Sequence, residues 1–124
     1  MASKRPKYLN LFKIKLPLPG MVSILHRASG ALLFLAIPLF LIGLQTSLAS
    51  PNSFEETRML LAHPLAKLGL LGLFWLLLHH FFAGIRYLAM DLHYCIDLPQ
   101  TRRSSVMVLV ASLGLTLMLG VWLW

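Results

Sequence analysis

The chain has 124 residues, of which 58% are hydrophobic and only 12% are charged, and its mean hydropathy of +0.77 is far from that of a soluble domain. This composition excludes a soluble enzyme, a disulfide-stabilised scaffold and a disordered chain. The net charge of +7 does not indicate nucleic-acid binding, because the basic residues flank apolar segments and do not line a soluble face.

Three apolar stretches are long enough to cross a membrane. A bilayer core about 30 Å thick requires roughly 20 apolar residues per helix. Stretches without any charged residue cover residues 28–54, 68–85 and 104–124. We therefore predict an all-α integral membrane protein with three transmembrane helices. The predicted parts are a basic cytoplasmic arm over residues 1–20 and a membrane domain over residues 21–124, with spans at about 22–49, 65–92 and 103–124.

The distribution of basic residues predicts the orientation in the membrane. Only Arg58 and Lys67 lie between the first two spans, and every other Lys and Arg lies toward the opposite side. The positive-inside rule then puts the N-terminus inside and the C-terminus outside. The N-terminal arm is short and lacks a long Ser- and Arg-rich presequence, so we expect a bacterial inner membrane and not a mitochondrial one.

Local sequence signals predict where two helices begin. The segment 17–20 contains two prolines and is expected to be extended, so the first helix is predicted to begin near residue 21 or 22. Between the first two spans, Ser53 followed three residues later by Glu56 is the pattern of a capping box. It predicts a short surface helix over about residues 54–62.

Ionisable residues inside a membrane span are candidate functional residues, since a charge at the bilayer centre costs on the order of 2.5–3.5 kcal/mol. Four sites meet this criterion. They are the segment 23–27 at the start of the first span, the pair His79 and His80, Arg86, and Asp91.

The two adjacent histidines cannot act together on one metal ion, because neighbouring residues on a helix point about 100° apart. Gly84 lies one turn beyond His80 on the same face, where a missing side chain leaves room for a flat macrocycle. Two other interpretations stay open. A lone histidine can be neutral and hydrogen-bonded to a neighbouring helix, and a glycine can serve only close helix packing.

A haem with two axial ligands would need a second donor, for which histidine is a common choice. The third span contains no histidine, and His63 and His93 lie outside the hydrophobic core. His26 lies at the inner edge of the first span and is expected to be displaced in depth from His80. If His80 binds haem, the opposite ligand should therefore come from another polypeptide. Covalent c-type attachment is excluded, because Cys95 is the only cysteine.

Ser23, His26 and Arg27 converge on one side of a helix at the inner membrane boundary. Arg and His can form charge-assisted hydrogen bonds to haem propionates, and Ser with Arg can donate to a quinone carbonyl. The alternative is that Arg27 reaches lipid phosphates while Ser23 caps the helix.

Two blocks of sequence surround these polar sites. Residues 23–30 read Ser-Ile-Leu-His-Arg-Ala-Ser-Gly, and residues 80–86 read His-Phe-Phe-Ala-Gly-Ile-Arg and are followed by Asp91. These blocks match the Ser-Ile-x-His-Arg-x-Ser/Thr-Gly and His-x-x-x-Gly-Ile-Arg-x-x-x-x-Asp patterns of a known family. Over nearly its whole length the chain resembles the cytochrome b membrane-anchor subunit of succinate dehydrogenase, respiratory complex II.

The resemblance implies a haem b shared between two subunits. His80 would be one axial ligand of the haem iron, the second histidine would lie on a companion anchor subunit, and His79 would not be a ligand. His26 and Arg27 would contact the haem propionates. Many family members carry a second histidine after Gly-Ile-Arg, where this chain has Tyr87, so the role of that histidine does not carry over.

The resemblance also implies a quinone site. Ser23, Ile24 and Arg27 would border the ubiquinone near the iron–sulfur subunit, and Asp91 would lie beside the same pocket. A fixed cation such as Arg27 would favour negative charge on a partly reduced quinone.

The implied function is that of a membrane anchor in electron transport and the tricarboxylic acid cycle. With the second anchor subunit it would hold the flavoprotein and iron–sulfur subunits on the inner membrane surface, where succinate is oxidised by those other subunits. One alternative is a fumarate reductase anchor that works with menaquinone. Another is a non-redox membrane scaffold or small transport subunit whose polar residues only bind helices together.

Overall fold

The computed structural model describes residues 15–124, which contain four helices and no strand. The helices are α1 (Leu18–Ala49), α2 (Pro51–Ala62), α3 (Pro64–Asp91) and α4 (Leu98–Leu123). Helices α1, α3 and α4 are each long and apolar enough to cross a membrane. The prediction of an all-helical protein with three spans is therefore confirmed, whereas most of the predicted basic arm lies outside the described residues.

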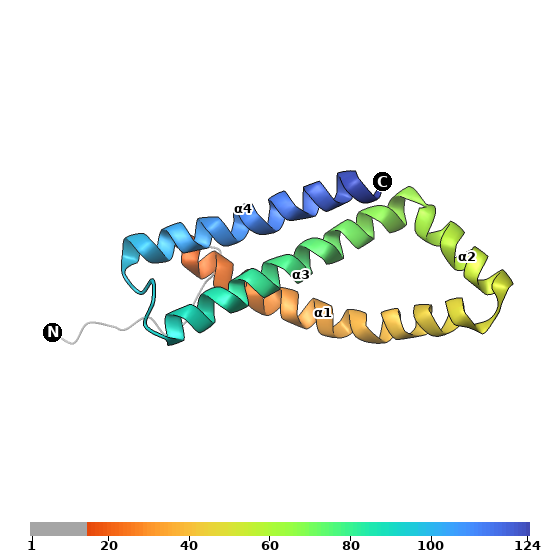
Figure 1. Cartoon of the computed structure of the whole chain (residues 1–124). Helices are drawn as coiled ribbons and strands as arrows, with labels where there is room; N and C mark the ends of the chain where they lie inside the picture. Colours follow the sequence, from red (N-terminus) through yellow and green to blue (C-terminus); the bar gives the residue numbers. More distant parts are fainter. Residues whose placement is uncertain (1–14) are drawn as a thin grey trace.

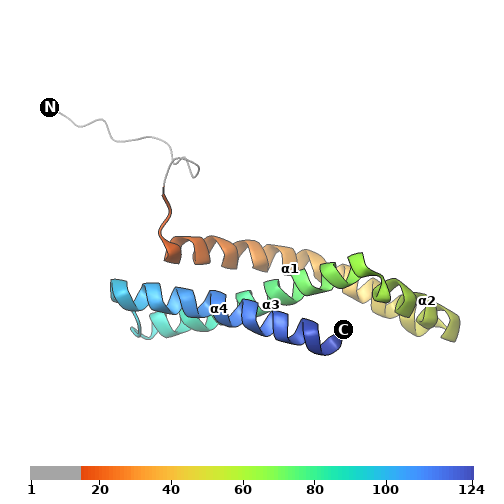
Figure 2. The ribbon, with the colours of Figure 1, turned by 90° about the horizontal axis from the view of Figure 1, so that it is seen from above.

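Helix α3 lies between α1 and α4 and contacts both of them (Figure 1). The start of α1, the end of α3 and the start of α4 meet at one end of the bundle. At the opposite end, α2 joins α1 to α3 where these two helices have moved apart (Figures 1 and 2). The three long helices thus run in alternating directions, as a chain that crosses a membrane three times requires.

Two of the long helices begin earlier than predicted. Helix α1 begins at Leu18, with Pro17 as its N-cap and Pro19 in its first turn. The expectation of an extended segment through residue 20 was wrong, because proline is compatible with the first turn of a helix, where its missing N–H has no partner to lose. Helix α4 begins at Leu98 and therefore includes Arg102, a basic residue that the predicted span left out.

The N-terminus of α2 is capped by a different serine from the one predicted. The Ser50 side chain accepts a hydrogen bond from the Ser53 N–H at 3.1 Å, and the Ser50 N–H donates to Ser53 Oγ at 3.0 Å. The capping box is therefore formed by Ser50 and Ser53, and the predicted pair of Ser53 and Glu56 was wrong. Pro51 follows directly as the first helical residue, a position that proline favours.

The bundle has a small interior and a large apolar surface. Val22 on α1, Ala83 on α3 and Val108 on α4 form the buried core where the three helices meet. Apolar side chains outside this core are exposed to a degree that is unusual for a soluble protein, such as Phe34 at 71% and Val121 at 84%. This surface requires lipid or another protein subunit around it.

Arg86 joins α3 to α4 at the end of the bundle where these two helices are connected. It is only 6% exposed. Its Nε donates to Ser104 Oγ at 2.9 Å and its Nη2 donates to the Thr101 carbonyl at 3.4 Å. The guanidinium also lies 5.2 Å from the centre of the Tyr87 ring, within cation–π range. No carboxylate within residues 15–124 pairs with Arg86.

Replacement of Arg86 with alanine is expected to weaken the contact between α3 and α4. The loss of hydrogen bonds from a charged group should lower the free energy of unfolding by about 1.5–3 kcal/mol. Thermal unfolding of the purified assembly in detergent measures this change. Arg102→Ala is the control, because Arg102 lies exposed on α4 at the same end of the bundle. Equal unfolding temperatures for the two variants would contradict the expected contribution of the Arg86 contacts to stability.

Candidate functional site

The His80 ring projects from α3 and is held by two groups of α1. Its Nδ1 lies 3.0 Å from the His26 carbonyl oxygen and 3.1 Å from Ser29 Oγ. The Ser29 hydroxyl donates to the same His26 carbonyl at 2.9 Å. Three polar groups thus form a small hydrogen-bonded ring where α1 and α3 meet.

These contacts determine which nitrogen of the neutral His80 ring carries the proton. A carbonyl oxygen can only accept hydrogen bonds, so Nδ1 is the donor and the free lone pair is on Nε2. Nε2 makes no hydrogen bond within residues 15–124. Unlike the two ring nitrogens of His79, it is not buried, so it is accessible to a ligand. The ring can bind a metal ion through Nε2, with Nδ1–H on a backbone carbonyl, as metal-ligating histidines commonly do.

Gly30 makes the close approach of this ring possible. A Cβ atom at position 30 would lie 2.8 Å from Cε1 and 3.4 Å from Nδ1 of His80. The first distance is shorter than a real carbon contact. Any side chain at this position would therefore push His80 away from α1.

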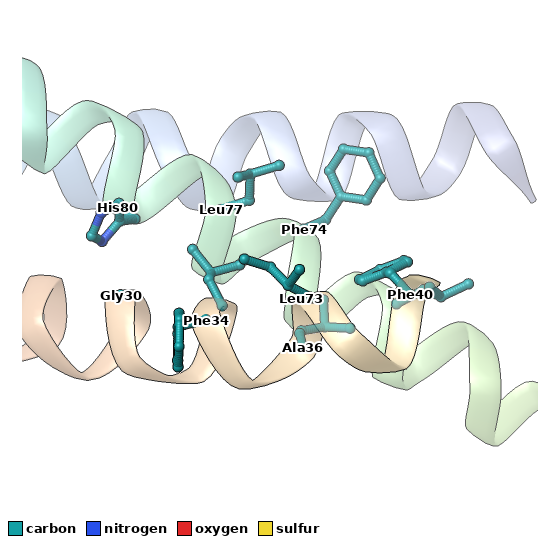
Figure 3. Close-up of a pocket in the computed structure, with 11 residues that line it drawn as sticks. Gly30, Phe34, Ala36, Phe40, Leu73, Phe74, Leu77 and His80 are labelled. Carbon is teal, nitrogen blue, oxygen red and sulfur yellow. The ribbon is translucent and has the colours of Figure 1, made fainter. Parts of the chain in front are cut away.

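An apolar groove of about 550 Å³ runs between α1 and α3, with His80 at one end (Figure 3). Its walls include the apolar side chains of Phe34, Phe40, Leu73, Phe74 and Leu77. Further along, Phe40 and Leu73 also line a second apolar groove, of about 440 Å³, that extends to α2. An apolar groove with one available nitrogen donor suits a large apolar ligand that carries a metal ion.

The structure brings His26 next to His80, which the sequence analysis did not expect. The two rings stack with centroids 4.2 Å apart and planes 12° from parallel. The expected displacement in depth was therefore wrong, because α1 crosses α3 at the level of these two residues. No macrocycle fits between faces this close, so in this arrangement His26 is not the opposite axial ligand of His80.

The space beside Gly84 is also used by His26. A Cβ atom at Gly84 would lie 3.8 Å from His26 Nε2, which is an ordinary contact. The predicted open space beside Gly84 is thus next to the His26 ring. Within residues 15–124, a ligand can reach His80 through the groove beside Gly30.

His79 is fully buried and points away from the groove. It is 0% exposed, and neither ring nitrogen has a hydrogen-bond partner within residues 15–124. Its nearest aromatic neighbour is Trp75, with ring centroids 5.6 Å apart. The expected hydrogen bond from a histidine to a neighbouring helix is present at His80, which contacts α1 through Nδ1. The sealed His79 ring offers no nitrogen to a ligand in the groove.

The residues expected at a quinone site lie on the exposed side of α1. Ser23 is half-buried, Ile24 is 40% exposed and Arg27 is exposed. Ser23 and Arg27 are four residues apart, and Gly30 and Phe34 continue the same stripe of the helix into the groove beside His80.

Asp91 is not brought into contact with this stripe. It is the last residue of α3 and is exposed, at the end of the bundle where α1 begins (Figure 1). Within residues 15–124 no hydrogen bond or ion pair joins Asp91 to Ser23 or Arg27. Its expected place beside the quinone pocket stays a prediction.

Tyr87 lies at the position where the resemblance to the cytochrome b anchor subunits leads us to expect a histidine. Its ring centroid is 5.2 Å from that of His26, and the ring packs against Val22, Ala83 and Val108. Its hydroxyl is buried and has no partner within residues 15–124. Tyr87 therefore packs between His26 and the buried core in this chain.

Ser29 and Gly30 were not assigned a role from the sequence, although both lie in the first block. A signal was present, because Ser29 is three residues after His26 and a serine hydroxyl can reach the carbonyl three residues back. The sequence could not reveal that Nδ1 of His80 contacts the same carbonyl oxygen.

Comparisons with known proteins show the family of this chain. Residues 1–119 match the family described as the succinate dehydrogenase/fumarate reductase transmembrane subunit. The succinate dehydrogenase cytochrome b556 subunit of Coxiella burnetii is 41% identical over the full length of both chains. The subunit of the same name from Paracoccus denitrificans is 30% identical over 92% of this chain and 88% of its own length. The mitochondrial succinate dehydrogenase cytochrome b560 subunit of Sus scrofa is 32% identical over 95% of this chain and 73% of its own length.

Proposed function

Because the chain belongs to the succinate dehydrogenase/fumarate reductase transmembrane subunit family, we propose that it is the haem b-binding membrane anchor of a succinate dehydrogenase that reduces ubiquinone. The three relatives named above are all succinate dehydrogenase cytochrome b subunits, which favours this activity over fumarate reduction with menaquinone. The single observation that carries the proposal is the available Nε2 of His80 at the end of an apolar groove.

His80 is the proposed axial ligand of the haem iron. The His26 carbonyl and Ser29 hold the proton on Nδ1, Gly30 provides space for the ring, and the apolar walls of the groove suit a porphyrin. Bound there, haem b would supply a one-electron carrier within the membrane. His26 and Arg27 are the proposed partners of its propionates, as basic side chains next to each other near His80.

The second axial ligand is proposed to come from a companion anchor subunit. The groove is open on the surface of the isolated chain, and its exposed apolar side chains need a covering partner. Because His26 stacks on His80, the nearest histidine is on the wrong side to be that ligand. A helix from another chain can approach across the groove.

Ser23, Ile24, Arg27 and Asp91 are the proposed ubiquinone contacts. The hydroxyl of Ser23 would hydrogen-bond a quinone oxygen, and the Arg27 guanidinium would stabilise negative charge as electrons arrive from the iron–sulfur subunit. Both side chains lie on the stripe of α1 that leads into the groove, so a quinone there would be close to the haem.

The proposed setting is a multi-pass protein in a bacterial inner membrane, with its N-terminus inside. The flavoprotein and iron–sulfur subunits would be held on the inner surface, where most basic residues of this chain lie. In this assembly the chain takes no part in succinate oxidation and contributes to the quinone site.

Purification of the tagged chain from its own membrane tests the proposal. A flavoprotein, an iron–sulfur protein and a second small membrane protein should co-purify, and the reduced-minus-oxidised spectrum should contain b-type haem bands. A colourless protein without a flavoprotein partner would instead support a membrane scaffold. Faster reaction with a low-potential menaquinone analogue than with a ubiquinone analogue would favour the fumarate reductase alternative.

Arg27→Ala and Ser23→Ala are expected to impair quinone reduction selectively. For Arg27→Ala, loss of a charge that stabilises the reduced quinone should lower the rate on the order of 100-fold. Succinate oxidation with a dye that accepts electrons from the other subunits should keep its rate. Arg102→Ala is a matched control, since it removes an exposed basic residue from α4 at the same end of the bundle. Equal loss of both activities would indicate an assembly defect and contradict the assignment.

A further inference from the structure

We infer that Ser29 is a positioning residue that sets the donor strength of His80 toward iron, and with it the reduction potential of the bound haem. This inference rests on the proposed function, because it requires that His80 ligates the haem. The inference goes beyond ligation, because it assigns a role to a hydroxyl whose contacts are the His26 carbonyl and Nδ1 of His80.

The geometry around Nδ1 carries the inference. Ser29 is 0% exposed, so no water competes for its hydroxyl. Its single proton is directed to the His26 carbonyl at 2.9 Å, which leaves a lone pair of Oγ for the Nδ1–H at 3.1 Å. The same Nδ1–H points to the His26 carbonyl at 3.0 Å. One proton of the imidazole is therefore shared between two acceptors.

Acceptors at Nδ1–H increase the electron density of the imidazole ring. A ring with more electron density is a stronger ligand for the ferric ion and lowers the reduction potential of the haem. The donation from Ser29 to the carbonyl strengthens Oγ as an acceptor, because hydrogen bonds in a chain polarise one another. Removal of the hydroxyl should therefore weaken the ligand even though the backbone carbonyl stays in place.

Ser29 is well suited to this role because its backbone is fixed by the contact of α1 with α3. Gly30 follows directly and allows the His80 ring to lie against the helix. The relation between Ser29, the His26 carbonyl and His80 is thus built into rigid helical backbone and does not depend on a loop.

Ser29→Ala tests the inference in the purified complex, with the haem midpoint potential as the readout. We expect haem to be retained and its midpoint potential to shift upward, whereas Ser29→Thr, which keeps a hydroxyl, should restore the original value. Ser47→Ala is the matched control, because Ser47 is half-buried on the same helix and also donates to the carbonyl three residues back, at 2.8 Å, with no histidine beside it.

The outcomes separate this inference from the proposed function. An upward shift in Ser29→Ala with unchanged potentials in Ser29→Thr and Ser47→Ala supports the inference. Haem retained with an unchanged or lowered potential in Ser29→Ala overturns it and leaves the haem assignment intact. A wild-type complex without haem removes the proposed function itself. Loss of haem in Ser29→Ala with retention in Ser29→Thr would mean that the hydroxyl is needed for ligation, and would also overturn the claim of tuning alone.

Discussion

His80→Ala is expected to abolish the b-type haem spectrum of the assembled complex. Among residues 15–124, His80 alone combines access of a ring nitrogen to the α1–α3 groove with a proton fixed on the opposite ring nitrogen, and the variant removes it. An axial ligand supplied from one side only would leave the iron weakly held, so haem content should fall to a small fraction of the wild-type value. A pyridine haemochrome assay on the purified complex measures this loss.

The adjacent histidine provides the matched control for this result. His79→Leu removes an imidazole one residue away that is 0% exposed and has no hydrogen-bond partner within residues 15–124. Replacement of an unpaired buried polar group by an apolar side chain of similar size is close to neutral or stabilising. We expect His79→Leu to retain its haem. Retained haem in His80→Ala, or lost haem in His79→Leu, would refute the ligand assignment.

Gly30→Ala is expected to displace His80 and to reduce haem binding by roughly 10–100-fold, the range seen when support of a metal ligand is lost. The added methyl group would lie 2.8 Å from Cε1 of His80, and its nearest contacts are all atoms of that ring. Because alanine is the better helix former by about 1 kcal/mol, α1 itself should not be weakened. Any effect must then come from the position of the ring.

Gly43→Ala makes the same chemical change in the same helix without this contact. A Cβ atom at Gly43 meets nothing within 4 Å. We expect normal haem content for Gly43→Ala and low haem content for Gly30→Ala in difference spectra of equal amounts of complex. Similar haem content in the two variants would show that His80 does not depend on the space at Gly30.

Helix boundaries illustrate the limits of reading this sequence. The charge-free stretches located the three spans, because the cost of burying a charge in a bilayer can be counted along the chain. They did not locate the helix ends, because α1 and α4 continue into the boundary region, where Pro19 and Arg102 are tolerated. The cap of α2 at Ser50 was missed for a related reason, since the proline after it was not used as a signal for the first helical position.

The chemistry of single residues was accessible from the sequence, and the relation between helices was not. Composition and the 3.6-residue repeat of a helix predict an all-helical membrane chain with three spans. They also single out the histidines and arginines inside these spans as candidate functional residues. Three features depend on how α1 crosses α3. They are the choice of the histidine that faces the groove, the stacking of His26 on His80, and the support of the His80 ring by Ser29 and Gly30. That crossing is determined by packing between residues more than 50 positions apart, at distances of a few ångströms, and no local pattern along the chain encodes it.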